Sequence, residues 1–564
     1  MSDAAELFAS AVDALSRGDV AAGAALLDDC LEREDLPDAR DVLGGLCYMD
    51  DDLDGARREW EHAFRGFRDA DDLRAAARVA TRLGQLHWGA LGNEATGRGW
   101  LERARRLLER VGPCVEWGYW ELAQLACDRP DVEALASGAE RAIDVATHYG
   151  DHDLEVRALG DLGVALVSQG RVREGFERLD EALAALTAGD VRDPYVIGTT
   201  FCALLTSCDR TGDVERATEW IRVVRELVLY LTGGRPRVLA THCQVAFGGV
   251  LSAAGRWPEA EEAILAALGP EASPSVAHRT EATARLAELR LQQGRVDEAA
   301  ALLAPIEDRL AAAGPLATLH RRRGEPALAV AVLENAVRQL VGDALRAAPL
   351  LCTLVEADLA CGDAGAAADA AKLLRSMSVA VDAPVVGALA RVADGRVARA
   401  AGRTTDAVES LDAALARLGD DDRPALAAEI HLERAESLDD AGDRDAAIAS
   451  ARAAHAAAQR IGAAQVRDRT SALLRRLGVR PPRARVPASA SAPSSSALDA
   501  LTAREREVLD GMRAGDSNAQ IAARLFLSAK TVEHHVSRIL AKLGVRTRAE
   551  AAAVAAAADS IATP

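Results

Sequence analysis

A recurring pair of small residues constrains the fold of this chain more than any other feature. In each pair a glycine is followed five positions later by a second glycine or an alanine. The pairs are Gly18 and Gly23, Gly170 and Gly175, Gly212 and Ala217, Gly255 and Ala260, Gly294 and Ala299, Gly324 and Ala329, Gly362 and Ala367, Gly402 and Ala407, and Gly442 and Ala447. From Gly170 onward the mean interval is about 39 residues, which is typical of stacked helix pairs.

Each pair lies between two segments with helical periodicity. In LGDLGVALVSQGRVREGFERLDEALAAL, which surrounds Gly170, apolar residues recur at steps of three and four. Glycine permits the left-handed backbone that ends the first helix, and the later small residue allows the second helix to pack closely. The series resembles the tetratricopeptide repeat, with a period longer than the usual unit of about 34 residues. Between Leu53 and Gly163 the spacing is less regular, which predicts either degenerate repeats or an inserted helix.

The resemblance implies a superhelical array with an extended concave face. Such faces bind partners in repeat proteins, so we expect a protein or small-molecule effector on the array. The alternative is that the array is only a scaffold. Alanine is the most frequent residue and aromatic residues make up only 3%, which also favours helix over strand and an all-α fold.

Aromatic residues gather in one part of the array. Phe64, Phe67 and Tyr119 lie there together with five of the seven tryptophans. These tryptophans are Trp60, Trp88, Trp100, Trp117 and Trp120. Large rings at helical spacing either fill a core or line a pocket for a ligand or partner, and the sequence leaves both readings open.

Charge is divided unevenly along the chain. Residues 498–564 include nine basic and eight acidic residues, whereas the whole chain has a formal net charge of −19. The residues before 498 therefore carry a net charge of −20, which would repel the phosphates of a nucleic acid. Any contact with nucleic acid is expected in the C-terminal segment.

No pattern predicts secretion, membrane insertion or a bound cofactor. The N-terminus has acids where a signal peptide needs positive charge, and no apolar run is long enough to span a membrane. The nine cysteines form no C-x-x-C pair, which is typical of thiols in a reducing cytoplasm. Lys372, Lys530 and Lys542 each follow alanine, so the phosphate-binding loop G-x-x-x-x-G-K-[ST] cannot occur. We expect a cytoplasmic protein without a cofactor, a catalytic residue or a membrane contact.

Composition divides the chain into three parts. Residues 1–478 contain the repeats, residues 479–497 are a Pro/Ser/Ala-rich stretch expected to be a mobile tether, and residues 498–564 form a C-terminal domain. Three capping boxes are predicted in that domain, at Thr502 with Glu505, Ser517 with Gln520, and Thr547 with Glu550. Ser528 is expected to cap a further helix. Only Phe526 and Leu527 separate the second and third helices, which predicts a helix-turn-helix.

The adjacent residues Glu533, His534 and His535 are all metal-ligand types. Consecutive helical residues point about 100° apart, so these three side chains cannot converge on one ion, and no metal site is expected. The apolar stripe of this helix, expected to be buried, comprises Val532, His535, Val536, Ile539, Leu540 and Leu543. The opposite, polar stripe comprises Lys530, Glu533, His534, Ser537, Arg538 and Ala541.

The segments LTAREREVL, SNAQIAARL and LSAKTVEHHVSRILAKLGVRTRAEA together resemble the luxR-type DNA-binding domain. This resemblance implies that the third helix enters the major groove and that two copies pair through the fourth helix on double-stranded DNA. By resemblance, the base-facing positions are Glu533, His534 and Ser537. The positions near phosphates are Asn518, Lys530, Thr531, Arg538 and Lys542.

Two departures from the family pattern are informative. The family often has lysine where this chain has Glu533, and a carboxylate there accepts a hydrogen bond from cytosine N4, so we expect an altered sequence preference. Large regulators of this family commonly carry a nucleotide-binding domain before helical repeats. This chain has no phosphate-binding loop, so it resembles those regulators without that domain.

The expected function is that of a transcription regulator. The array would receive a signal, and the C-terminal domain would bind promoter DNA as a homodimer. An alternative is a helical-repeat adaptor whose C-terminal domain serves mainly for dimerisation. A third reading is an enzyme, but no metal spacing, nucleophile elbow or phosphate loop supports it.

Overall fold

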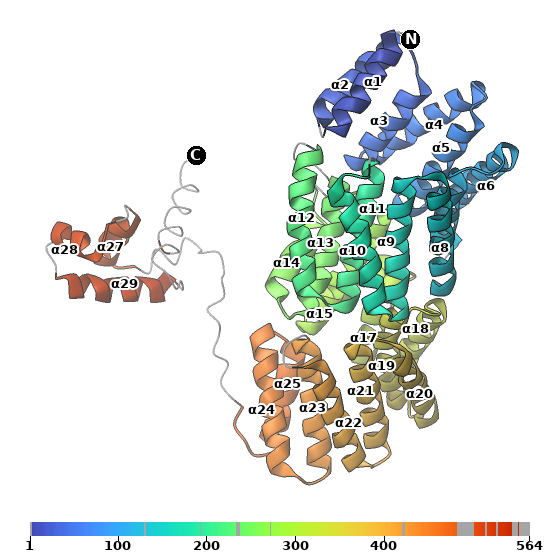
Figure 1. Cartoon of the computed structure of the whole chain (residues 1–564). Helices are drawn as coiled ribbons and strands as arrows, with labels where there is room; N and C mark the ends of the chain where they lie inside the picture. Colours follow the sequence, from blue (N-terminus) through green and yellow to red (C-terminus); the bar gives the residue numbers. More distant parts are fainter. Residues whose placement is uncertain are drawn as a thin grey trace. The chain divides into compact units, whose positions relative to one another are not determined.

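The computed structural model forms two compact units, residues 1–481 and 482–564. The residues that it describes are 3–17, 19–128, 131–191, 193–232, 237–270, 272–419, 423–481, 501–513, 516–525, 528–543 and 551. Within these ranges every regular element is a helix, as Figure 1 shows, so the predicted all-α fold is confirmed. No helix in the same ranges combines the length and the apolar character needed to cross a membrane. Most of the predicted tether lies outside the described residues.

The helices of the first unit follow one another through short connections. Their bounds are α1 (Asp3–Ser16), α2 (Val20–Arg33), α3 (Pro37–Met49), α4 (Leu53–Asp69), α5 (Leu73–Gln85), α6 (Glu94–Val111), α7 (Glu116–Asp128), α8 (Val132–Tyr149), α9 (His152–Gln169), α10 (Val172–Ala188), α11 (Pro194–Thr211), α12 (Val214–Thr232), α13 (Arg237–Ala253), α14 (Trp257–Ala266), α15 (Val276–Gln292), α16 (Val296–Leu303), α17 (Ala313–Arg322), α18 (Pro326–Gln339), α19 (Ala344–Cys361), α20 (Ala364–Ala380), α21 (Pro384–Ala400), α22 (Thr404–Leu418), α23 (Pro424–Asp440), α24 (Arg444–Ile461) and α25 (Ala464–Arg476). A π-helical turn, η1 (Leu86–Ala90), and two 3-10 turns, η2 (Ala304–Ile306) and η3 (Leu310–Ala312), lie between them.

Consecutive helices of this unit pack as hairpins, from α1 with α2 to α23 with α24. The predicted turn glycines that the structure describes have the left-handed backbone that ends a helix, with φ of +88° at Gly170 and +82° at Gly362. Gly18 lies outside the described residues. The alanines five positions after the turn glycines are fully buried, and they are Ala217, Ala260, Ala299, Ala329, Ala367, Ala407 and Ala447. The hairpin prediction is therefore confirmed.

The less regular stretch consists of hairpins too. At the turn before α4, Asp51 has a φ of +66°, and Ala56 five positions later is fully buried. At the turn before α6, Gly92 has a φ of +66°, and a Cβ added to Gly97 would lie only 2.9 Å from the carbonyl oxygen of Gly84. Aspartate can occupy the left-handed region because its short side chain bonds locally. Degenerate repeats, and not an inserted helix, explain the irregular spacing.

Hairpins that are distant in the sequence also touch one another. Arg423 Nη2 donates a hydrogen bond of 2.8 Å to the carbonyl oxygen of Thr211 at the end of α11. Ser273 Oγ donates one of 2.7 Å to Asp51 Oδ1. Helices α9 and α19 are likewise in contact, as can be followed in Figure 1. Early and late hairpins of the array are therefore in direct contact.

The aromatic cluster packs into the cores of the early hairpins. Trp60 is only 2% exposed. Trp100 lies edge-to-face on Phe64 with ring centroids 5.0 Å apart, and Trp117 lies edge-to-face on Trp120 at 5.5 Å. Such pairs stabilise a core beyond the area that they bury. The cluster was predicted either to fill a core or to line a pocket, and these contacts are those of core packing.

The second unit has three described helices, α27 (Ala503–Arg513), α28 (Asn518–Leu525) and α29 (Ala529–Leu543). They enclose one small core, whose buried members are Leu501, Val508, Leu509, Met512, Ile521, Ala522, Val532, Ile539 and Ala551. Gly511 allows α27 and α28 to approach closely, because a Cβ added there would lie 2.7 Å from Ile521 Cγ1.

Candidate nucleic-acid interface

Capping boxes fix where α27 and α28 begin. Glu505 Oε2 accepts a hydrogen bond of 2.8 Å from the backbone N–H of Thr502, and Thr502 Oγ1 accepts one of 3.3 Å from the backbone N–H of Glu505. Ser517 and Gln520 exchange the same two bonds at 2.7 and 3.3 Å. Both capping boxes confirm the sequence prediction. Each box satisfies backbone N–H donors that the start of a helix leaves unpaired.

Helices α28 and α29 form the predicted helix-turn-helix. Ser528 caps α29, since its Oγ accepts a bond of 3.1 Å from the backbone N–H of Thr531 and lies 2.7 Å from Thr531 Oγ1. Helix α29 contacts both α27 and α28. The capping box predicted at Thr547 and Glu550 lies outside the described residues, so the fourth helix stays a prediction.

The described residues of the predicted apolar stripe of α29 are buried or half-buried, whereas the side chain of Leu543 lies outside what the structure describes. Val532 and Ile539 are fully buried, and Val536 and Leu540 pack against the same core. His535 is half-buried at the edge of this face. Because the apolar face anchors the helix to the domain, the opposite face is the one available to a ligand.

The opposite face of α29 is basic where its side chains are described. Lys530 and Arg538 are both exposed there. Glu533, His534 and Ser537 belong to the same helix, but their side chains lie outside what the structure describes. Their base-facing role therefore stays a prediction that rests on helix position.

The remaining predicted phosphate contacts occupy three different settings. Asn518 is the first residue of α28 and is half-buried. Thr531 is exposed in the first turn of α29, where its hydroxyl already meets Ser528. Lys542 lies in the last turn of α29 and forms an ion pair within the domain. The structure therefore does not bring the predicted set together as one uniform patch.

Lys542 contacts a residue that sequence reasoning treated only as part of a cap. Its Nζ lies 2.6 Å from Glu505 Oε2, and the Glu505 side chain is only 4% exposed. This hydrogen bond, with a second from the Thr502 backbone, lowers the pKa of Glu505 to about 2. The spacing of the two residues gives no sequence signal, because it depends on how α29 crosses the start of α27.

Metal ligands do not gather in the part of the chain that is described. No group of three or more histidine, cysteine, aspartate or glutamate side chains there could hold an ion. Unpartnered buried nitrogens do occur in this part, and His535 Nδ1 is one of them. A single imidazole at the edge of a small core has a packing role and offers no coordination set.

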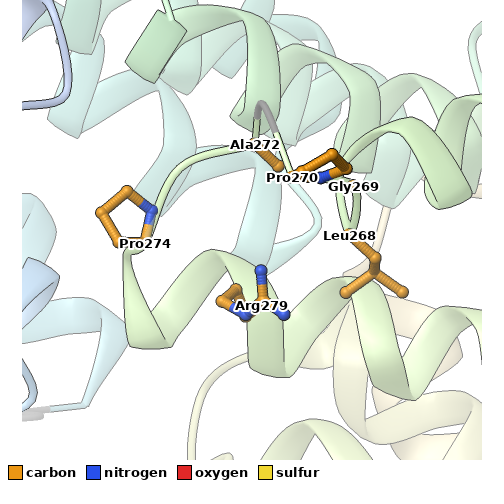
Figure 2. Close-up of a pocket in the computed structure, with 6 residues that line it drawn as sticks. All are labelled: Leu268, Gly269, Pro270, Ala272, Pro274 and Arg279. Carbon is orange, nitrogen blue, oxygen red and sulfur yellow. The ribbon is translucent and has the colours of Figure 1, made fainter.

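A shallow hollow that sequence reasoning did not single out lies on the array. Figure 2 shows it at the loop between α14 and α15, with the rings of Pro270 and Pro274 on the loop and Arg279 on α15. Leu268, Gly269 and Ala272 complete the lining. Arg279 is the only ionisable side chain among these lining residues. In the sequence, the prolines of GPEASPS were the available sign of a loop at this position.

The chain thus combines a helical-repeat array with a C-terminal helix-turn-helix domain. The family model described as "Bacterial regulatory proteins, luxR family" matches residues 499–555. The chain is 45% identical over 51 residues to the spore germination protein GerE of Bacillus subtilis, a match that covers 9% of this chain and 69% of that protein. The chain therefore belongs to the luxR family of bacterial regulatory proteins.

Other relatives match the same short segment. The chain is 56% identical over 52 residues to the uncharacterized transcriptional regulatory protein YhcZ of Bacillus subtilis, which covers 9% of this chain and 24% of that protein. It is 50% identical over 58 residues to the DNA-binding transcriptional activator DevR/DosR of Mycobacterium tuberculosis, which covers 10% and 27%. The chain thus spans about a quarter of the length of these two relatives.

One solved structure is similar over most of the chain. The crystal structure of the APC/C hetero-tetramer Cut9-Hcn1 has a TM-score of 0.45 and 14% sequence identity, and the match covers 83% of this chain and 96% of that chain.

Proposed function

We propose that this protein is a transcription regulator that binds double-stranded DNA through α29. The observation that carries the proposal is the position of Lys530 and Arg538, exposed on the face of α29 opposite its buried apolar stripe. Exposed cations on the second helix of a helix-turn-helix are suited to the phosphates that border a major groove. The family match supports the same conclusion.

Base reading is assigned to the residues between these cations. Glu533, His534 and Ser537 lie on α29 between Lys530 and Arg538. A glutamate accepts from cytosine N4, and serine and histidine can donate to acceptors on base edges. The proposed phosphate contacts also include Asn518 and Thr531.

Binding as a homodimer follows from the small charge of the C-terminal segment. Residues 498–564 carry nine basic and eight acidic residues, so one copy neutralises few phosphates. Pairing through the segment after α29 would double the contacts and set the spacing of two half-sites.

The array is proposed to receive the signal, as a protein or a small molecule. It carries the excess acid of the chain, so it is unsuited to bind DNA itself. Its stacked hairpins offer a large surface for a partner, and the hollow beside Arg279 offers a smaller one. The alternative remains a helical-repeat adaptor whose C-terminal domain serves for dimerisation.

Selection from a pool of random DNA duplexes with the full-length chain separates these two functions. The regulator proposal predicts enrichment of one motif with two related half-sites. A variant with His534→Ala and Ser537→Ala should enrich a less defined motif from the same pool. An adaptor would dimerise but enrich no sequence, and that result would reject the proposed function.

A further inference from the structure

We infer that Lys542 is a positioning residue, which sets the orientation of α29 through Glu505 and does not bind a phosphate. The inference rests on the proposed function, because its consequence is measured on DNA. It also departs from the family resemblance, which implies a position for Lys542 near phosphates.

One oxygen of the buried Glu505 carboxylate, Oε2, accepts three hydrogen bonds. It accepts from the Thr502 backbone N–H at 2.8 Å, from the Thr502 hydroxyl at 2.9 Å, and from Lys542 Nζ at 2.6 Å. The side chain of Glu505 is 4% exposed, whereas that of Lys542 is 35% exposed. If Lys542 moved away to a phosphate, the buried carboxylate would lose its cationic partner, and a buried charge without such a partner is costly.

The first turn of α27 holds both helices of the helix-turn-helix. Arg504 Nη2 donates a bond of 2.5 Å to the carbonyl oxygen of Leu525, the last residue of α28. The next residue, Glu505, holds Lys542 in the last turn of α29. Two consecutive side chains of α27 therefore bond to the ends of α28 and α29, in addition to the apolar core that the three helices share.

A positioning residue and a phosphate ligand predict different salt dependences. Each phosphate that a protein neutralises adds about 0.9 to the slope of log affinity against log salt concentration. Loss of a phosphate ligand lowers this slope by about that amount. Loss of a positioning residue lowers DNA affinity at each salt concentration and leaves the salt slope unchanged. It also reduces discrimination between selected and random duplexes, because the misplaced base-contacting side chains no longer prefer the selected site.

For Glu505→Gln the two roles of Lys542 predict changes of opposite sign in DNA affinity. Glutamine keeps the capping box, so α27 retains its start. If Lys542 bound phosphate, removal of its competing carboxylate would free the ammonium and tighten DNA binding. If Lys542 positions α29, the same substitution breaks the tie and weakens binding.

The test compares full-length parent, Lys542→Met, Glu505→Gln and the double variant on a duplex selected by the parent and on a random-sequence duplex. We expect each single variant to bind the selected duplex about tenfold more weakly with an unchanged salt slope, because a charge-assisted hydrogen bond is lost. The double variant should be no weaker than either single one. Lys542→Arg should restore the parent ratio of selected to random affinity, which a general loss of folding could not explain.

Tighter binding by Glu505→Gln, or a salt slope lowered by about 0.9 in Lys542→Met, would overturn the inference. Lys530→Met is the matched control, since it removes an exposed cation from the same helix and should lower the slope. Thermal melting of each variant reports folding separately. If the parent chain binds neither duplex, the proposed function fails, and this result is distinct from failure of the positioning role.

Discussion

The backbone N–H of Asp382 donates a hydrogen bond of 2.8 Å to the carbonyl oxygen of Gly170 and so joins the turn before α10 to the start of α21. Gly170 has a φ of +88°, and the side chain of Val381 occupies the space where its Cβ would be. At Gly255 an added Cβ would lie 2.7 Å from Ile461. These turn glycines therefore serve two purposes: they end a helix and they admit a distant hairpin.

The first prediction separates these two purposes. Gly170→Ala combined with Gly255→Ala places two methyl groups against neighbouring hairpins, and such overpacking costs about 1–3 kcal/mol per site in addition to the left-handed strain. We expect the thermal midpoint of the full chain to fall by at least about 2–4 °C more than in a control with equal strain.

The control is Gly324→Ala combined with Gly402→Ala. Both glycines also have left-handed backbones, with φ of +76° and +74°, but nothing lies within 4 Å of an added Cβ. Equal thermal midpoints for the two double variants would show that contacts between distant hairpins do not stabilise the array.

The second prediction concerns acid and the histidines of the array. Burial lowers the pKa of His87, His431 and His455, and burial together with His242 lowers that of His278 to about 4. Below about pH 6.5 these histidines therefore bind protons in the unfolded chain but not in the folded chain, and the free energy of unfolding falls. Each such histidine removes up to about 1.4 kcal/mol per pH unit until its folded pKa is reached.

Thermal midpoints of the full chain at pH 7.5, 6.0 and 5.0 measure this loss. His242 opposes this loss of stability, because its contacts with Cys202 outweigh the effect of burial and raise its pKa. His278→Gln should make the decline with falling pH shallower. If the variant declined as steeply as the parent, proton exclusion at His278 would not contribute.

The third prediction concerns the exposed face of α29. Lys530→Met and Arg538→Met should each lower the salt slope of DNA binding by about 0.9, because each removes one phosphate contact. Affinity should fall by a similar factor on selected and random duplexes. An unchanged slope in both variants would place the DNA on another face of the domain.

The fourth prediction concerns base reading by the same helix. His534→Ala with Ser537→Ala should reduce the ratio of selected to random affinity by about tenfold or more, since a base contact contributes about 1–3 kcal/mol of discrimination. The salt slope should stay that of the parent. A variant that keeps both the selected motif and the ratio would show that neither side chain reads a base.

Local features of this protein could be predicted from sequence because each depends on a few adjacent residues. Gly170 with Gly175 encodes a hairpin, and Thr502 with Glu505 encodes a helix start, whatever surrounds them. The left-handed turn at Asp51 could not be predicted from the sequence, because aspartate more often caps the start of a helix than follows its end.

Contacts between distant segments could not be predicted in the same way. The bond from Asp382 to Gly170 depends on the sum of small rotations from one hairpin to the next, which no local pattern encodes. The ion pair of Lys542 and Glu505 depends on the crossing of α27 and α29, so no local pattern around either residue predicts it.

The central claim, that α29 binds DNA through its exposed basic face, is tested most directly by fluorescence anisotropy of a labelled duplex titrated with full-length chain. The account predicts saturable binding by the parent and loss of binding when Lys530→Glu and Arg538→Glu are combined. The control combines Arg65→Glu with Arg452→Glu, an equal charge change at exposed positions of the array, and it should bind like the parent. Parent-like binding by the α29 double variant, or no binding by the parent at low salt, would contradict the account.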